Sequence, residues 1–100
     1  MPAGKRRACL LSPKAEADLE EIWLYTFMNW SLEQADSYHA AIVDVFDDLA
    51  SGRKIGRPVD IRDGYFKYPV GSHFVFYRLT ETDLVIVRVL HQRMDVGRHL

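Results

Sequence analysis

The sequence predicts an α+β domain with the order β-α-α-β-β-β, in which an α-helical hairpin packs on one face of an antiparallel-rich sheet. Two stretches with apolar residues three and four positions apart, 13–29 and 31–51, predict the helices. Three apolar segments separated by short polar turns, within residues 61–91, predict antiparallel strands. With 100 residues and 48% hydrophobic content, the chain is expected to form one domain over residues 1–100.

Residues 6–11 predict a short first strand, because they end in three apolar residues and Ser12-Pro13 follows at once. The basic run Lys5-Arg-Arg7 resembles the start of a signal peptide, but the apolar stretch behind it is far too short for an export signal or a membrane span. We therefore expect a cytoplasmic protein without membrane association. The single cysteine, Cys9, excludes an internal disulfide and indicates a small buried apolar residue.

The first helix is expected to begin at Ser12, which can cap it, with Pro13 in the first position, and to run to about Asn29. Its apolar stripe is Ala15, Leu19, Ile22, Trp23, Thr26, Phe27 and Trp30. Ser31 and Gln34 form a capping-box pattern that starts the second helix, and Ser51-Gly52 ends it. Its apolar face is Ala35, Tyr38, Ile42, Val45, Phe46 and Leu49. The short connection predicts an antiparallel hairpin.

Residues 53–60 show no periodicity and are expected to form a loop, followed by strands at 61–68, 72–79 and 83–91. The last strand is apolar on both faces: Val85, Val87 and Val89 are expected to point one way, and Leu84, Ile86 and Leu90 the other. That pattern predicts a central strand, with the first strand pairing beside it. Arg88 lies within this apolar strand, so we expect an ion pair with an acid of a helix or loop.

Charge is distributed unevenly along a chain of net charge -1. Residues 1–11 carry three basic groups and no acid, residues 12–51 carry Lys14 against nine acids, and residues 52–100 carry nine basic groups against five acids. The ends should therefore be positive and the helices negative, an arrangement that can orient a charged partner. A solvated helical surface explains the acids of the middle segment equally well.

Several kinds of chemistry are not supported by the sequence. The four histidines, His39, His73, His91 and His99, lack the paired spacing of a metal site, and the six glycines form no phosphate-binding loop. We expect neither a metal nor a cofactor. Ser12, Ser31, Ser37 and Cys9 have simpler capping, surface or core roles, so a covalent hydrolytic mechanism is not expected.

Two regions are candidates for binding. Trp23, Phe27 and Trp30 form an aromatic row, in which core packing is the favoured role for Trp23 and Phe27. Trp30, at the helix end, fits equally well in a groove that receives an apolar segment of a partner. The basic tail with His91, Arg93, Arg98 and His99 follows the last strand and is free to meet a partner, the alternative being a frayed terminus.

Three segments carry a resemblance to a known family. They are Ala17-Asp-Leu-Glu-Glu-Ile22 in the first helix, Phe74-Val-Phe-Tyr77 in a middle strand and Val87-Arg-Val-Leu-His-Gln-Arg-Met-Asp95 at the end of the sheet. With the helical hairpin and the terminal strands, they resemble the ParE toxins of the RelE/ParE superfamily of type II toxin-antitoxin modules. The resemblance covers about residues 5–100, nearly the whole chain.

The superfamily has a second branch, the RelE-type toxins, which cut messenger RNA in the ribosome and hold its phosphate with basic residues. In that branch an arginine usually stands where this chain has Phe74, another near Met94, and a tyrosine near Leu100. These three side chains supply neither charge nor a proton. Arg93 could replace the tail arginine, but no neighbour replaces Phe74. The resemblance thus implies a ParE-like toxin that is not an enzyme.

What the resemblance implies is a toxin that inhibits DNA gyrase. A ParD-type antitoxin would neutralise it in a hetero-oligomer and would make most of the contact with DNA. The tail position implies target binding by Arg93, Met94, Asp95, Arg98 and His99, and the helical hairpin implies antitoxin binding by Trp23, Phe27, Trp30, Tyr38 and Phe46. Two alternatives stay open. One is a RelE-type ribosome-dependent endoribonuclease that holds phosphate with Arg57, Arg62, Lys67 and Arg93, and the other is a non-toxic homologue that only binds an antitoxin.

Overall fold

Two long helices form the predicted antiparallel hairpin. In the computed structural model, which describes residues 6–100, they are α1 (Pro13–Asn29) and α2 (Leu32–Ala50). The Ser12 hydroxyl accepts the N–H of Ala15 at 3.0 Å, and the Ser31 hydroxyl accepts the N–H of Gln34 at 3.0 Å. Both caps confirm the predicted helix starts, because each satisfies a backbone donor that has no partner within its own helix.

Five strands form one mixed sheet in the order β1-β5-β4-β3-β2. Their bounds are β1 Ala8–Leu11, β2 Arg57–Pro58, β3 Tyr65–Val70, β4 His73–Leu79 and β5 Asp83–His91. β1 pairs in parallel with β5, and the other neighbours are antiparallel. The central position of β5 and its pairing with the first strand are therefore confirmed.

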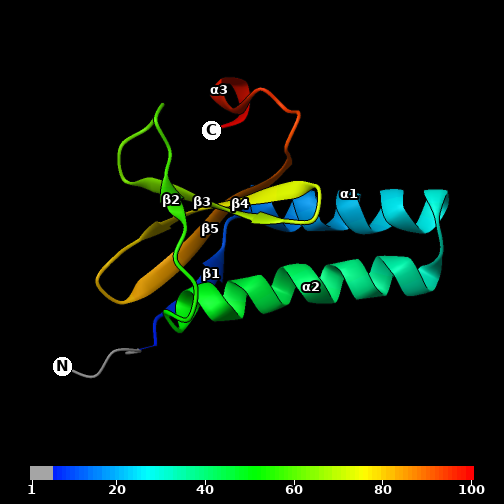
Figure 1. Ribbon diagram of the computed structural model, residues 1–100, viewed down its shortest axis with the longest axis horizontal. Helices are drawn as coiled ribbons and strands as arrows, with labels where there is room; N and C mark the ends of the chain where they lie inside the picture. Colours follow the sequence, from blue (N-terminus) through cyan, green and yellow to red (C-terminus); the bar gives the residue numbers. More distant parts are fainter. Residues whose placement is uncertain (1–5) are drawn as a thin grey trace.

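The helical hairpin covers one face of the sheet, as predicted (Figure 1). The main core lies between the two layers and includes Ala15 and Leu19 from α1, Ile42, Val45, Phe46 and Leu49 from α2, and Val75, Tyr77, Leu84, Ile86 and Val89 from the sheet. Cys9 is only half-buried against this core, less than predicted. Figure 1 shows both helices running on beyond the sheet.

The region before β3 differs from its prediction. Residues 53–60 were expected to be loop throughout, but Arg57–Pro58 forms the edge strand β2. Residues 61–64 form a turn instead of strand, because Gly64 adopts a φ of 82° and turns the chain into β3. In the next hairpin Pro69 still pairs with Phe74 within the strands, so only Gly71 and Ser72 form the turn.

A β-bulge interrupts the pairing of β4 with β5. Phe76 lies opposite Arg88 and Tyr77 lies opposite Ile86, so Val87 is the extra residue of β5. The bulge shifts the alternation along the strand. Val89 consequently packs in the same core as Ile86, and the predicted grouping of Val89 with Val85 and Val87 is wrong.

The tail folds back onto the face of the sheet opposite the helices. It contains the short helix α3, Val96–His99, which Asp95 caps by accepting the N–H of Gly97 at 3.0 Å. A second cluster forms beneath it from Val59, Phe76 and Leu90, with Tyr65, Phe74, Val96 and Leu100 packed around them. The tail is therefore ordered, and the alternative of a frayed terminus is wrong.

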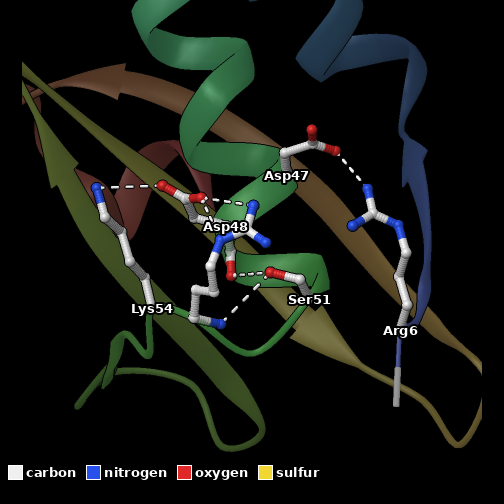
Figure 2. A network of polar contacts seen from close by, with 6 residues as sticks. Arg6, Asp47, Asp48, Ser51 and Lys54 are labelled. Atoms are coloured by element: carbon white, nitrogen blue, oxygen red, sulfur yellow. Dashed lines mark hydrogen bonds and ion pairs between the residues drawn. The ribbon is translucent and has the colours of Figure 1, made fainter. Parts of the chain in front are cut away.

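Polar contacts fix the end of α2 (Figure 2). Asp47 forms an ion pair with Arg6, and Asp48 accepts from Arg53 at 3.0 Å and from Lys54 at 3.3 Å. The basic residues next to α2 are thus paired locally. Lys5 of the predicted basic run lies outside the described residues. Within residues 6–100, no helix combines the length and the apolar character needed to span a bilayer.

Candidate functional site

The aromatic row lies mostly at the surface. The Trp23 and Phe27 rings stack with centroids 5.3 Å apart, and the Trp23 Nε1–H donates to Asp36 at 2.9 Å. Phe27 is 44% exposed and Trp30 is 75% exposed, so the prediction that Phe27 packs in the core is wrong. The reason is that the last turns of α1 extend past the ends of the strands (Figure 1).

The end of the helical hairpin exposes an unusual amount of apolar surface. Its large side chains that are at least 44% exposed are Leu24, Tyr25, Phe27, Met28, Trp30 and Leu32. Exposed apolar patches of this kind mark protein interaction sites, because water contact with apolar surface is unfavourable. The sequence indicated Trp30, whereas the contribution of Tyr25 and Met28 became evident only from the structure.

An open groove of about 890 Å³ runs beside the row. We call it the acidic groove; its lining residues are Leu11, Glu16, Leu19, Glu20, Trp23, Leu24, Asp36 and His39. Three exposed carboxylates, those of Glu16, Glu20 and Asp36, surround apolar side chains there. This combination suits a segment that carries both apolar and basic residues.

The other two predicted antitoxin-binding residues occupy different surroundings. Phe46 is 5% exposed and belongs to the core, so it presents no surface to a partner. The Tyr38 hydroxyl accepts the N–H of Ser72 at 3.0 Å and lies 2.7 Å from His73 Nδ1. A Cβ atom at Gly71 would lie 2.5 Å from the Tyr38 ring, so Tyr38 packs directly against the β3–β4 turn.

A second groove, of about 320 Å³, separates α1 from the end of β5. We call it the imidazole groove; its lining residues are Asp18, Glu21, Ile22, Tyr25, Thr26, His73, Val89, His91 and Met94. His73 of β4 and His91 of β5 lie directly opposite each other on neighbouring strands, with ring centroids 5.3 Å apart. Burial lowers the pKa of His73, the neighbouring His91 lowers it further, and Asp18 opposes the shift.

A buried ion pair joins the two predicted binding regions. Arg88 Nε and Nη2 each donate to the Asp18 carboxylate at 2.8 Å, which confirms the predicted ion pair with a helix acid. Arg88 Nη1 also donates to the carbonyl oxygen of His99 at 3.2 Å. The Asp18 bonds raise the pKa of the Arg88 guanidinium, so it stays charged. Asp18 therefore connects α1 to β5 and, through Arg88, to the tail.

The tail residues predicted for target binding differ in exposure. Arg93, Met94, Asp95 and Arg98 are exposed, whereas His99 is half-buried. Arg98 lies 3.8 Å from Asp95 in an exposed ion pair, and Arg62 donates a hydrogen bond to the Leu100 carbonyl oxygen. Met94 lines the imidazole groove, so the structure brings one tail residue to the helical hairpin.

The described part of the chain offers little for metal or nucleophilic chemistry. Within residues 6–100, no group of three or more His, Cys, Asp or Glu side chains is placed to hold a metal ion. Burial raises the pKa of the Cys9 thiol, and Asp47 raises it further, which keeps the thiol protonated near neutral pH. The geometry instead provides the acidic groove, the imidazole groove, an apolar helix end and an anchored basic tail.

Comparison with known proteins finds a matching family model and sequence relatives that align with most of the chain. A family model described as "ParE toxin of type II toxin-antitoxin system, parDE" matches residues 9–96. The chain is 50% identical to Toxin ParE1 of Mycobacterium tuberculosis (strain H37Rv) over 93 residues, which cover 91% of this chain and 95% of that protein. It is 40% identical to Toxin ParE1 of Caulobacter vibrioides over 91 residues, covering 90% and 94%.

Two solved structures have the same fold. A chain of the chromosomal ParDE toxin-antitoxin system from P. aeruginosa superposes with a TM-score of 0.76 at 20% identity, covering 86% of this chain and 96% of the other. A chain of the RelBE2 toxin-antitoxin complex from Mycobacterium tuberculosis gives a TM-score of 0.65 at 25% identity, covering 87% and 99%. The predicted α+β architecture is therefore confirmed as RelE/ParE-like.

Proposed function

Because the chain belongs to the ParE toxin family of type II toxin-antitoxin systems, we propose that it arrests growth by inhibiting DNA gyrase and that a ParD-type antitoxin neutralises it. The family membership carries the proposal. The structure adds a basic tail that is exposed and anchored at the same time. Such a tail can dock on a protein target at low ordering cost, because the free chain already holds it in place.

Arg93, Met94 and Arg98 are the strongest candidates for the gyrase contact. All three are exposed, and they flank Asp95, whose carboxylate caps α3. The hydrogen bond from Arg88 to His99 and the packing of Leu100 on the second cluster hold the segment on the sheet. The proposed contact is therefore a charged surface on a rigid support.

The side chains at the three RelE-type catalytic positions support binding over bond cleavage. Phe74 is half-buried at the edge of the second cluster, and Leu100 packs against the same cluster. Met94 is 45% exposed and lines the imidazole groove. Phe74 and Leu100 thus have packing roles, and none of the three side chains can hold a phosphate or transfer a proton. We propose that the chain is not an enzyme.

For the antitoxin we propose an amphipathic segment with basic residues, seated along the helical hairpin. The exposed apolar end offers Trp30 and Tyr25, and the carboxylates of the acidic groove offer complementary charge. A segment that continues into the imidazole groove would also contact Met94 of the tail. Such an antitoxin would mask part of the gyrase contact, which gives neutralisation a direct steric basis.

The gyrase proposal is tested by a supercoiling assay with the purified chain. We expect inhibition by the wild type, at least tenfold weaker inhibition by the double variant Arg93→Glu/Arg98→Glu, and unchanged inhibition by Lys14→Glu, which alters an exposed charge on α1. Full gyrase activity at a large molar excess of the folded wild-type chain would disprove the proposal.

The antitoxin proposal is tested by co-expression with a ParD-type antitoxin. We expect the two proteins to purify as one complex and growth to recover. Trp30→Ala should weaken that complex, whereas Ile61→Ala, which removes an exposed apolar side chain from the opposite half of the molecule, should leave it intact. Equal losses for the two variants would place the antitoxin elsewhere.

A further inference from the structure

The start of the tail is held by the end of β5. The Met94 N–H donates to the His91 carbonyl oxygen at 2.9 Å, and the Arg93 N–H donates to His91 Nδ1 at 3.1 Å. Both bonds use the backbone of residues proposed for the gyrase contact, and neither depends on residues 96–100. Arg93 and Met94 are therefore placed by the strand that precedes them.

The last turn of the tail needs a separate support. The helix α3 spans only Val96–His99, and so short a helix does not persist without tertiary contacts. Within this turn the Arg98 N–H donates to the Asp95 carbonyl oxygen at 3.1 Å, and the Leu100 N–H donates to the Val96 carbonyl oxygen at 2.9 Å. Val96 and Leu100 pack on the second cluster. Apolar packing is non-directional, so it does not by itself fix the orientation of the turn.

Arg88 supplies a directional contact to this turn. Its Nη1 donates to the His99 carbonyl oxygen at 3.2 Å, and such carbonyl groups have no partner within their own helix. Arg62 also donates to the tail, at the Leu100 carbonyl oxygen, but its side chain is exposed. The Arg88 side chain is only 15% exposed, so its bond is expected to hold the backbone more firmly than the bond from Arg62.

The Arg88 guanidinium is itself held in place. β1 pairs with β5 only as far as Ile86, and beyond that point Asp18 of α1 accepts the Val89 N–H at 2.9 Å. The same carboxylate accepts from Arg88 Nε and Nη2, both at 2.8 Å. A planar guanidinium that is bonded at two nitrogens has its third nitrogen in a fixed position. Asp18 and Arg88 together therefore determine where the His99 carbonyl oxygen lies.

From this arrangement we propose that Arg88 is a positioning residue, which sets the place of Arg98 in the target contact and leaves Arg93 unaffected. Arg98 directly precedes His99, so the bond from Arg88 fixes the backbone from which the 83% exposed Arg98 side chain extends. The inference rests on the proposed function and deepens it. The contact with gyrase would consist of one half held by β5 and one half held by Arg88.

The test is a pair of double-variant cycles in the supercoiling assay with the intact chain. Arg88→Lys keeps a positive charge opposite Asp18 but lacks the second terminal nitrogen that reaches the His99 carbonyl oxygen. We expect Arg98→Gln to weaken inhibition about tenfold in the wild-type background and less than about twofold in the Arg88→Lys background. Arg93→Gln is the matched control and should weaken inhibition by the same factor in both. Equal factors for Arg98→Gln in the two backgrounds would overturn the inference.

Hydrogen exchange measures the positioning without gyrase. In Arg88→Lys the Leu100 amide should exchange faster, because the turn that protects it opens more often, whereas the Met94 amide should keep its wild-type rate. Ile42→Val is the control for a general loss of stability, because Ile42 lies in the main core between α2 and the sheet. It should not single out the Leu100 amide. Unchanged exchange of that amide in Arg88→Lys would overturn the inference.

A second variant keeps the test decisive if Arg88→Lys does not fold. Asp18→Asn/Arg88→Met removes both charges of the buried pair and leaves an amide oxygen for the Val89 N–H. It should reproduce both effects expected of Arg88→Lys. Failure of the wild-type chain to inhibit gyrase would disprove the proposed function and, with it, a role of Arg88 in the target contact. Full gyrase inhibition together with a Leu100 amide whose exchange does not depend on Arg88 would overturn the inference alone.

Discussion

Asp18 and Arg88 form a two-point ion pair with both N–O distances at 2.8 Å, although 70 residues separate them in the chain. The side chains are 11% and 15% exposed, and Asp18 also accepts the Val89 N–H at 2.9 Å. Through the bond from Arg88 to the His99 carbonyl oxygen, this pair joins α1, β5 and the tail. It is the structural link between the proposed antitoxin surface and the proposed gyrase contact.

Removal of one partner of this pair should destabilise the fold strongly. Arg88→Met leaves the Asp18 carboxylate buried without its counter-charge, a change that costs about 3 kcal/mol of unfolding free energy. Urea denaturation measures the loss. Arg98→Met is the matched control, because its ion pair with Asp95 is exposed, and we expect a change within about 0.5 kcal/mol. Equal effects of the two substitutions would contradict the structural role of Asp18.

The two turn glycines Gly71 and Gly64 should respond differently to alanine. Both have positive φ, so each substitution should cost about 1 kcal/mol in backbone strain. Gly71→Ala also forces a Cβ against the Tyr38 ring, whereas nothing lies within 4 Å at Gly64. We expect Gly71→Ala to lose about 1–3 kcal/mol more than Gly64→Ala. Thermal unfolding of the two variants measures the difference, and equal melting temperatures would exclude the predicted contact.

Stability should decrease on acidification because of His73. Its pKa in the folded chain is below the ordinary value of 6.5, mainly because of burial, so the unfolded chain binds the proton more readily. The contribution is fully present above about pH 6.5 and is lost as the pH falls toward the lower folded-state pKa. His73→Gln should flatten the dependence of unfolding free energy on pH between 7.5 and 5, whereas His39→Gln, at an exposed site, should not. Parallel curves for His73→Gln and wild type would refute this.

Phe46 and Trp30 were both predicted to bind the antitoxin, but their replacement by alanine should change the unfolding free energy by very different amounts. Phe46→Ala creates a cavity in the core and should cost about 3–5 kcal/mol of unfolding free energy. Trp30→Ala removes a side chain that is 75% exposed, so we expect a stability change within about 0.5 kcal/mol. Chemical denaturation distinguishes them. A large loss for Trp30→Ala would mean that the helix end packs more tightly than the structure shows.

Part of the candidate site was accessible from the sequence. The exposed tail residues Arg93, Met94, Asp95 and Arg98, and Trp30 at the helix end, were identified from pattern and resemblance. Phe27 was misplaced, because periodicity defines one face of a helix but not where the sheet beneath it ends. Phe46 follows the apolar period of α2 together with Ile42 and Leu49, and like them it is buried in the core.

The pairing of His73 with His91 shows a second limit of prediction from the sequence, which is the register between strands. Counting outward from the Leu79–Leu84 pair would place His73 opposite Leu90, and only the extra residue Val87 places it opposite His91. No local residue pattern announced that bulge. The imidazole groove therefore could not be predicted, although both histidines were noted.

The sequence by itself determined the helix ends, the number of long strands and the central position of β5, because caps, turns and periodicity act over a few neighbouring residues. The tertiary structure alone decided the bulge, the docking of the tail and the Asp18–Arg88 pair. These features depend on which distant segments come together and in which register. Many alternative pairings satisfy the same local pattern, and they are separated only by the energy of the fully packed chain.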